Sequence, residues 1–241
     1  MTLATGFFDG VHLGHRAILD GAQLALTFLN HPLEVLNPIE APKLITDLET
    51  RLKLINLPTT VLKFDEQLAQ MSAAQFAERF LKGYRIRCGE NWRFGKGAEG
   101  SPEWLRNNGY EVEVVPYVEY QGAAISSSRI RSALENGALN LAEAMLGRTF
   151  SVKGTIVDGK GKGRSLGFPT LNLDRDEMPP LKRGVYSALV NYGLAPTFGA
   201  AAWNTPVMEA HLMKFIREER RFDSIEELKA QIKQDLIEGA L

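Results

Sequence analysis

The chain has 241 residues, 44% of them hydrophobic and 24% charged, with a formal net charge of -1. This length allows one large domain or two modest ones, and the balance is that of an ordinary globular protein. The near-zero charge gives no sign of general nucleic-acid or membrane binding, and a single cysteine, Cys88, excludes an internal disulfide framework. No apolar run is long enough to span a bilayer and no signal-peptide pattern is present, so the cytoplasm is the expected location.

The start of the chain predicts a buried apolar strand that runs to Phe8 and breaks at Asp9-Gly10, with a helix from His15 onward. His12 and His15 therefore fall at a strand-to-helix turn, where backbone N–H groups without an intrahelical partner make an anion site. Gly14 between them has no Cβ, so a phosphate can approach the backbone. The alternative is a turn with two surface histidines. The H-x-G-H motif lies at the first strand–helix junction of a chain with only four histidines, and this position favours a functional role for the two histidines.

Strand-like and helix-like stretches alternate through the rest of the first half. Strands are expected at 24–28, 60–64, 85–89 and 111–115, and helices at 48–55 and 73–81, the second capped by Ser72. This alternation predicts a parallel sheet with helices on both faces, in which ligands bind beyond the C-terminal strand ends. His12, His31, Asn91 and the Ser126 region all follow predicted strands, so we expect them to converge on one site.

Two further stretches of the first half carry polar groups suited to phosphate. Ser126, Ser127 and Ser128 precede a helix and can cap it or donate to phosphate oxygens, and Arg131 can fork onto a pyrophosphate. The alternative is a well-capped surface helix with stray arginines. The loop 89–97 contains aromatic and basic residues that could pack on the ring system of a ligand and reach its phosphate. Equally, the loop could be a structural cap whose aromatic side chains fill the core.

The second half changes character near Gly147. Short β-type runs at 150–157, 184–190 and 207–212, separated by glycine and proline turns, predict a compact antiparallel barrel. A closing amphipathic helix is expected after Ser224, with Leu228 and Ile232 in its buried stripe.

The second half also carries candidate phosphate and metal ligands. Gly159, Gly161 and Gly163 alternate with basic residues and can wrap phosphates, although a flexible solvated loop fits the same pattern. Thr170 and Asn172 offer the oxygen donors that magnesium prefers. Glu209 is the candidate base, and a solvent-facing glutamate at a strand edge is the alternative.

Taken together, these residues resemble the bifunctional riboflavin kinase/FMN adenylyltransferases of bacteria, also called FAD synthetases, along the whole chain. The N-terminal markers are F-D-G-V-H-L-G-H at 8–15, H-P at 31–32, G-E-N-W-R-F-G at 89–95 and S-S-S-R-I-R at 126–131. The C-terminal markers are L-G-F-P-T-L-N at 166–172, G-V-Y at 184–186 and M-E-A-H around Glu209. Any one is weak, but their order and spacing together are highly specific.

The resemblance implies two reactions and an α/β fold of two domains. In a doubly wound parallel-sheet nucleotidyltransferase domain, 1–147, the FMN phosphate attacks the α-phosphorus of ATP, giving FAD and pyrophosphate. In a small antiparallel β-barrel kinase domain with a closing helix, 148–241, ATP phosphorylates riboflavin to FMN. The implied cofactor is Mg²⁺, and the implied partners are the small molecules riboflavin, FMN, FAD and ATP, with no nucleic acid and no membrane. The oligomeric state stays open.

The resemblance also implies residue roles. In the first domain it assigns the ATP phosphates to His12, Gly14 and His15, the pyrophosphate side to Ser127, Ser128 and Arg131, and flavin binding to His31, Asn91 and Arg93. In the second domain it assigns ATP to Gly159, Gly161 and Gly163, Mg²⁺ with ATP to Thr170 and Asn172, and the proton of the riboflavin 5′-hydroxyl to Glu209.

The chain is short for this family, and three positions depart from its pattern. Around Tyr192-Gly193 a strand and turn are missing, and between Leu212 and Met213 a loop and strand are missing. Near Leu24-Ala25 a helix runs into a strand without turn residues. Our hypothesis is that the sequence joins pieces of a longer protein without its mobile loops. If the loops are truly deleted, the kinase site is the more affected.

Three other readings compete. Other H-x-G-H nucleotidyltransferases, such as pantetheine-phosphate or nicotinate-nucleotide adenylyltransferases, do not explain the second domain. A class I aminoacyl-tRNA synthetase shares the histidine motif but is normally larger, and no K-M-S-K-S is present. A flavin-binding protein that has lost catalysis is disfavoured by the joint presence of His12, His15, Arg131, Thr170, Asn172 and Glu209.

Overall fold

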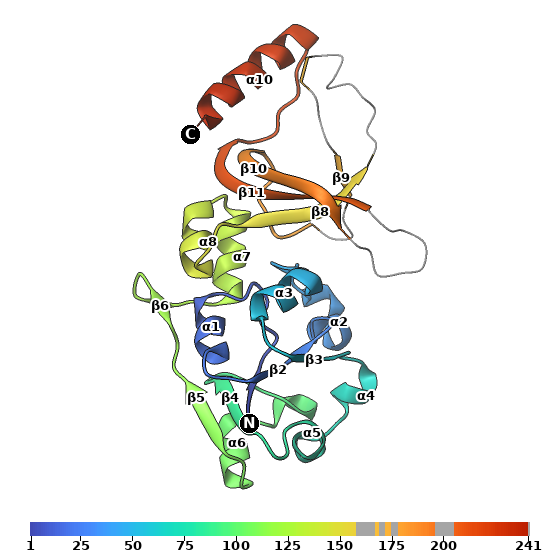
Figure 1. Cartoon of the computed structure of the whole chain (residues 1–241), viewed down its shortest axis with the longest axis vertical. Helices are drawn as coiled ribbons and strands as arrows, with labels where there is room; N and C mark the ends of the chain where they lie inside the picture. Colours follow the sequence, from blue (N-terminus) through green and yellow to red (C-terminus); the bar gives the residue numbers. More distant parts are fainter. Residues whose placement is uncertain (158–166, 169–171, 175–177, 196–204, 241) are drawn as a thin grey trace. The chain divides into compact units, whose positions relative to one another are not determined.

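The computed structural model of the chain describes residues 1–157, 167–168, 172–174, 178–195 and 205–240. They form two compact units, each with its own sheet (Figure 1). The first unit comprises Met1–Ile130 and Met145–Gly147, and the second comprises Arg131–Ala144 and Arg148–Leu241. The division therefore passes through a helix, and the domain boundary expected after Gly147 stays a prediction.

The first unit is built on a five-stranded parallel sheet in the order β3-β2-β1-β4-β5. The strands are β1 (Thr2–Thr5), β2 (Leu24–Phe28), β3 (Thr59–Leu62), β4 (Arg85–Gly89) and β5 (Val112–Val115). The sheet order reverses beside the central β1, which confirms a doubly wound α/β fold. In such sheets the crevice for ligands opens at the carboxyl ends of the strands on either side of the reversal, here β1 and β4.

Helices connect the strands of this sheet (Figure 1). They are α1 (Leu13–Leu19), α2 (Leu33–Leu36), α3 (Leu48–Ile55), α4 (Glu66–Ala69), α5 (Ala73–Phe80), α6 (Pro102–Asn107) and the start of α7 (Ser127–Glu135). Short 3-10 turns lie at Pro38–Glu40 and Lys96–Ala98, and β6 (Glu119–Tyr120) pairs with β7 (Ala123–Ala124). The expected cap of α5 is confirmed, because Ser72 and Gln75 form a reciprocal capping box.

The first strand is shorter than expected. It ends at Thr5, so Phe7 and Phe8 belong to the following loop. Both still pack against the sheet, and Phe8 is only 1% exposed. The apolar residues correctly predicted that this stretch is buried, but the predicted strand conformation at Phe7 and Phe8 was wrong. Buried loop residues can be as apolar as strand residues, so the pattern does not distinguish the two.

The second unit contains a four-stranded antiparallel sheet in the order β10-β11-β8-β9. Its strands are β8 (Ser151–Val157), β9 (Asn172–Asp174), β10 (Val185–Ala195) and β11 (Thr205–Arg217), and its helices are α8 (Leu139–Leu146) and the C-terminal α10 (Ile225–Gly239). An antiparallel sheet with a closing helix is confirmed. Among the described residues these strands form a row with β10 and β9 at its edges.

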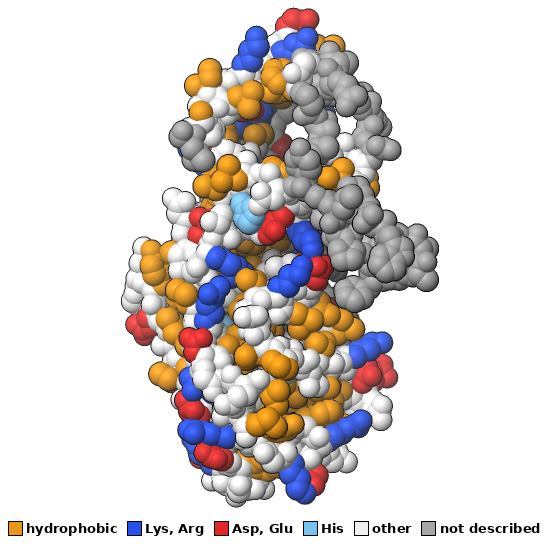
Figure 2. Space-filling model, in the orientation of Figure 1, with side chains coloured by type: hydrophobic (Ala, Val, Ile, Leu, Met, Phe, Trp, Pro, Cys, Tyr) orange, Lys and Arg blue, Asp and Glu red, His pale blue; other side chains and the backbone are white. Residues whose placement is uncertain are grey.

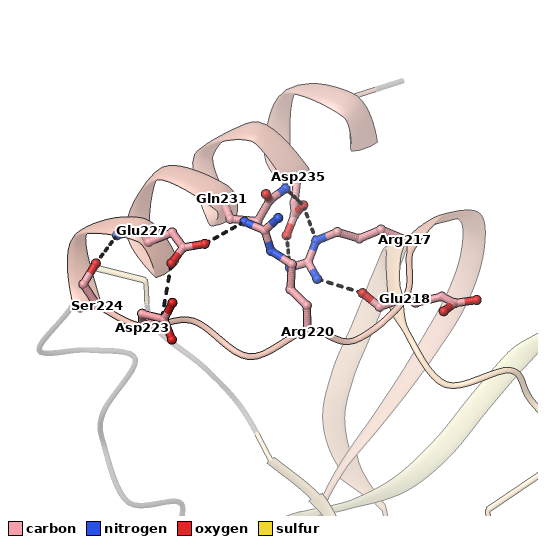
Figure 3. Close-up of polar contacts among 8 residues, drawn as sticks. All are labelled: Arg217, Glu218, Arg220, Asp223, Ser224, Glu227, Gln231 and Asp235. Carbon is pink, nitrogen blue, oxygen red and sulfur yellow. Dashed lines mark hydrogen bonds and ion pairs between the residues drawn. The ribbon is translucent and has the colours of Figure 1, made fainter.

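The closing helix α10 is held differently from the prediction. Ser224 caps it as expected, with its Oγ 3.1 Å from the Glu227 N–H. The expected buried stripe was wrong, because Leu228 and Ile232 are only half-buried and no residue of α10 is fully buried. Polar contacts join its described residues to the end of β11, among them the fork between Arg217 and Asp235 (Figure 3).

The three positions that depart from the family pattern lie in regular structure. β2 begins at Leu24, and the long β10 and β11 continue through 192–193 and 212–213. The expectation that no turn precedes Leu24 was wrong. α1 ends at Leu19, and a turn follows in which Gly21 has a φ of 86° that favours glycine. The hypothesis of absent loops stays a prediction.

Charged side chains of both signs are scattered over the visible face, with apolar side chains between them (Figure 2). No described helix combines the length and the apolar character that a membrane crossing would require. Cys88 is buried in β4, and this burial raises the pKa of its thiol to about 11. A thiol with that pKa is almost entirely protonated near neutral pH and is a poor nucleophile.

Candidate functional site

The two histidines of the first motif lie at the N-terminus of α1, as expected. His12 is the N-cap, and its Nδ1 accepts the backbone N–H of His15 at 3.2 Å. The two rings are stacked with centroids 3.6 Å apart. A Cβ added at Gly14 would lie 3.2 Å from the His12 ring, so a side chain there would crowd it. The turn therefore presents two imidazoles and the first N–H groups of a helix in one place.

His15 is held in its neutral form. Burial lowers its pKa well below the ordinary value of 6.5, and His12 and Arg51 lower the pKa further. Its Nδ1 is buried and has no hydrogen-bond partner within the described part of the chain. A neutral imidazole carries one donor and one acceptor nitrogen, so His15 can donate to an oxygen without bringing a charge of its own.

The loop between β1 and α1 is strained and strongly anchored. Phe8 and Val11 have φ angles of 58° and 39°, a region that bulky side chains rarely adopt, and both are buried. Asp9 is 1% exposed, and its carboxylate accepts the Ile45 N–H at 2.9 Å and the Thr46 N–H at 3.1 Å. In the sequence Asp9 is recognisable only as a break in the strand, and the local pattern does not indicate this anchoring role.

The serine motif reaches the same loop. The Ser127 Oγ donates to the Asp9 carbonyl at 3.0 Å, so α7 begins beside the histidine turn. The Ser126 Oγ accepts the Arg129 N–H at 3.2 Å and caps this helix, while Ser128 is exposed. Arg131 lies one turn further along α7. The structure thus brings Ser127 to the motif and leaves the hydroxyl of Ser128 facing solvent.

The three residues expected to bind flavin are placed differently from one another. His31 follows β2, and its ring meets Phe7 edge to face at 4.9 Å. Asn91 is exposed and follows β4, the strand that pairs with β1. The exposed Arg93 turns back on its own loop and donates to the Trp92 carbonyl at 2.8 Å. His31 and Asn91 therefore lie at the expected carboxyl edge, whereas Arg93 in this structure serves its own loop.

A residue that sequence analysis missed is Arg51, on α3. It has no exposed surface, and its Nη2 donates to the carbonyls of Phe28 at 2.6 Å and Leu29 at 3.3 Å, at the end of β2. Its guanidinium carbon lies 4.3 Å from the centroid of the Phe7 ring. The only signal in the sequence was one arginine at an apolar position of the predicted helix, which a solvated helix face explains as well.

In the second unit, Glu209 lies in the middle of β11, half-buried. Its Oε1 accepts the Ser151 hydroxyl at 2.7 Å and lies 3.9 Å from the His211 Nε2. Glu209 is paired in register with Lys153 on β8. The hydroxyl orients one carboxylate oxygen, so the side chain is a directed acceptor rather than a free surface group. This favours the expected base over the solvent-facing alternative.

Only one of the predicted magnesium ligands is described. Asn172 is exposed on β9, opposite Val157 of β8. Val157 and Lys153 share one face of β8, because side chains alternate along a strand, so Asn172 shares the sheet face of Glu209. Thr170, Gly159, Gly161 and Gly163 lie outside the described residues. Within the described ranges, no group of three or more His, Cys, Asp or Glu is arranged to hold a metal ion.

The first unit has the features of a nucleotidyltransferase: an H-x-G-H turn at a helix N-terminus, at the carboxyl edge of a doubly wound sheet. The FAD synthetase family model matches residues 1–129, and the riboflavin kinase family model matches residues 146–240. The chain belongs to the family of bifunctional riboflavin kinase/FMN adenylyltransferases. It is thus a transferase of flavin-cofactor synthesis with a domain for each reaction.

Individual relatives agree with these matches. The bifunctional riboflavin kinase/FMN adenylyltransferase of Bacillus subtilis strain 168 is 33% identical over 282 residues, covering 97% of this chain and 89% of that protein. The enzyme of the same name from Escherichia coli strain K12 is also 33% identical, covering 97% and 90%. Both alignments are longer than the 241 residues of this chain, so the relatives carry residues within the aligned region that it lacks.

A solved structure also resembles the whole chain. A crystal structure from Streptococcus pneumoniae, described as a macrolide-efflux protein, is 28% identical with a TM-score of 0.78. The match covers 97% of this chain and 91% of that one. The likeness therefore extends over the architecture of both units.

Proposed function

We propose that the turn at His12–His15 carries adenylyl transfer to FMN and that Glu209 carries the phosphorylation of riboflavin. The observation that carries the first assignment is the stacked pair His12 and His15 at the N-terminus of α1. Ser127 lies close to this turn, because its hydroxyl donates to the Asp9 carbonyl. The observation that carries the second is the oriented carboxylate of Glu209. We place the boundary between the two domains after Gly147, a division that the two family matches support.

In adenylyl transfer an oxygen of the FMN phosphate attacks the α-phosphorus of ATP. The bond to the bridging oxygen of the β-phosphate breaks, and pyrophosphate leaves. No covalent intermediate on the protein is needed, so the protein positions the reactants and stabilises charge on the phosphoryl oxygens. His12, His15 and the N–H groups around Gly14 hold the ATP phosphates, Ser127, Ser128 and Arg131 hold the pyrophosphate, and His31, Asn91 and Arg93 hold the flavin nucleotide.

In the kinase reaction the riboflavin 5′-hydroxyl attacks the γ-phosphorus of ATP. Glu209 takes the hydroxyl proton, and ADP leaves. The Ser151 hydroxyl occupies one oxygen of Glu209, which leaves the other to accept that proton. We assign ATP binding to Gly159, Gly161 and Gly163.

Magnesium fits the donors proposed for this site. The exposed amide of Asn172 shares the sheet face of Glu209, and an amide oxygen with a threonine hydroxyl suits a hard cation that completes its shell with phosphates and water. We therefore propose Thr170 and Asn172 as the residues that hold Mg²⁺ with ATP. When bound, the ion neutralises charge on the phosphate oxygens. The partners we propose are small molecules rather than nucleic acid, and the reducing, ATP-rich cytoplasm suits both reactions.

A chromatographic time course tests the proposal. Purified protein is incubated with riboflavin, ATP and Mg²⁺, and a parallel sample starts from FMN. We expect FMN to appear first and FAD to follow, with both steps lost when the metal is chelated. FMN alone, with no FAD even from added FMN, would overturn the role of the histidine turn. No product from either substrate, in protein shown to be folded, would indicate a flavin binder without catalysis.

A further inference from the structure

Arg51 carries a buried charge that the protein itself only partly satisfies. Its side chain has no exposed surface, and only Nη2 forms hydrogen bonds, both to carbonyls at the end of β2. Nε and Nη1 are buried and have no hydrogen-bond partner among the residues that the structure describes. Buried donors are nearly always paired, because an unpaired one loses its hydration without compensation. Two unused donor nitrogens on one guanidinium therefore require an explanation.

The position of Arg51 connects the two halves of the adenylyltransferase site. Its guanidinium covers one face of the Phe7 ring at 4.3 Å, and the same ring meets His31 edge to face. Its charge also acts on His15, where it is one of the causes of the lowered pKa. Arg51 is thus near the histidine assigned to the ATP phosphates and shares the Phe7 ring with the histidine assigned to the flavin, at the carboxyl end of β2.

The acidic groups nearby are engaged by backbone donors. Asp9, Asp47 and Glu34 are close enough to act on the charge of Arg51. The Asp9 carboxylate accepts the N–H groups of Ile45 and Thr46, Asp47 accepts that of Thr50, and Glu34 accepts that of His31. Among the residues that the structure describes, Arg51 forms no ion pair with any of them.

We propose that Arg51 is a phosphoryl-binding residue of this site, whose unpaired Nε or Nη1 donates to an oxygen of a substrate phosphate. A guanidinium N–H carries positive charge and donates a short, strong hydrogen bond to a phosphate oxygen. The phosphate is the α-phosphate of ATP or the phosphate of FMN, which meet where adenylyl transfer occurs. Arg51 forms and breaks no covalent bond. Since its side chain has no exposed surface, the contact requires covering groups, among them the half-buried Phe7, to move aside when substrate binds.

The inference rests on the adenylyl transfer proposed above, and Arg51→Met tests it. We expect kcat/KM for FAD formation from FMN to fall about a hundredfold, since a donor to the transferring group is lost. Riboflavin phosphorylation by the same preparation should be unchanged, and Tm should not fall, because an apolar side chain replaces an under-satisfied buried charge. Arg51→Lys, which keeps the charge but not the planar guanidinium and its fixed donors, should lose about tenfold. Arg79→Met is the matched control, since Arg79 also lies over a phenylalanine ring but is exposed.

The outcomes separate the alternatives. A lower Tm for Arg51→Met with kcat/KM close to that of Arg79→Met would overturn the inference and leave Arg51 a purely structural residue. No FAD formation by the unaltered protein would instead overturn the proposed function.

A measurement on the unaltered protein covers the case in which Arg51→Met fails to fold. The Nε–H resonance of Arg51, assigned by its absence in Arg51→Lys, is followed by NMR while FMN or a non-hydrolysable ATP analogue is added. A shift with the ATP analogue identifies the α-phosphate as the partner, and a shift with FMN identifies the flavin phosphate. A resonance that moves with neither substrate, at concentrations that saturate the site, contradicts the inference.

Discussion

At the scale of single residues, the first site combines neutral and fixed-charge groups. His15 is held neutral by burial and by the neighbouring His12 and Arg51, while Arg51 keeps its charge beneath the same loop. A neutral imidazole can donate to a phosphate oxygen without repelling the nearby guanidinium, and the guanidinium supplies the positive charge. A buried arginine and a buried histidine can therefore lie close together, because only the arginine is charged.

The lowered pKa of His15 predicts a pH-dependent stability. The folded pKa lies below the ordinary 6.5, so the unfolded chain binds more protons as pH falls below that value. The free energy of unfolding should therefore decrease below pH 6.5, by up to about 1.4 kcal/mol per pH unit, until the folded pKa is reached. Native-state hydrogen exchange of α1 at several pH values measures this slope. His15→Asn should remove most of it, and equal slopes in both proteins would contradict the expectation.

Asp9 anchors the loop that leads into the His12–His15 turn, so its removal should destabilise the protein. Asp9→Ala leaves the buried N–H groups of Ile45 and Thr46 without their acceptor, and we expect a loss of about 2–3 kcal/mol. Denaturant unfolding of the first unit measures the loss. Asp65→Ala removes the exposed cap of α4 and should cost only about 0.5–1 kcal/mol. Similar losses in the two variants would show that Asp9 has no special anchoring role.

At the scale of elements, α10 shows how a helix can be held by its polar side. Its residues are exposed or half-buried, and the fork between Arg217 and Asp235 joins it to the end of β11 with distances of 2.8 and 2.7 Å (Figure 3). Gln231 donates to the same carboxylate at 2.7 Å. This arrangement explains why Leu228 and Ile232 keep the amphipathic spacing without forming a buried stripe.

Breaking this fork should loosen α10. Asp235→Ala is expected to lower the free energy that protects the α10 amides from hydrogen exchange by about 1 kcal/mol, because the pair is bidentate and mostly shielded. Arg217 lowers the pKa of Asp235, so the contribution is present above the ordinary value of 3.8 and is lost as pH falls through the lower folded pKa. Arg220→Ala, which breaks a longer and more exposed pair, should change exchange little. Equal changes in α10 exchange in the Asp235→Ala and Arg220→Ala variants would contradict a special role for the Arg217–Asp235 pair in holding α10.

At the scale of the whole molecule, the central residues of the two proposed sites belong to different compact units. His12, His15 and Ser127, which we assign to adenylyl transfer, belong to the first unit, and Glu209 and Asn172 belong to the second. The contacts described for His12, His15, Ser127 and Glu209 lie inside their own units, so substitutions at His12 and at Glu209 should affect the two chemical steps separately.

Two substitutions test this separation. Glu209→Gln should lower riboflavin phosphorylation by about 10²–10⁴-fold, the usual contribution of a general base, and leave FAD formation from FMN unchanged. His12→Asn should do the reverse, because asparagine still caps α1 but cannot replace the imidazole. Both rates are read by chromatography from one preparation of each variant. Loss of FAD formation from FMN in Glu209→Gln would contradict independent sites.

Local pattern was sufficient for most strands, for the caps at Ser72 and Ser224, and for the histidine turn, because periodicity and capping depend on residues a few positions apart. Tertiary structure alone decided the partners of Asp9, which lie 36 and 37 residues away, and the burial of Arg51. The physical reason is that hydrophobic pattern reports which side of an element is covered but not which distant group covers it. The burial of a charged side chain such as Arg51 therefore cannot be predicted from local sequence, because it depends on the sheet that brings Phe7, Phe28 and Arg51 together.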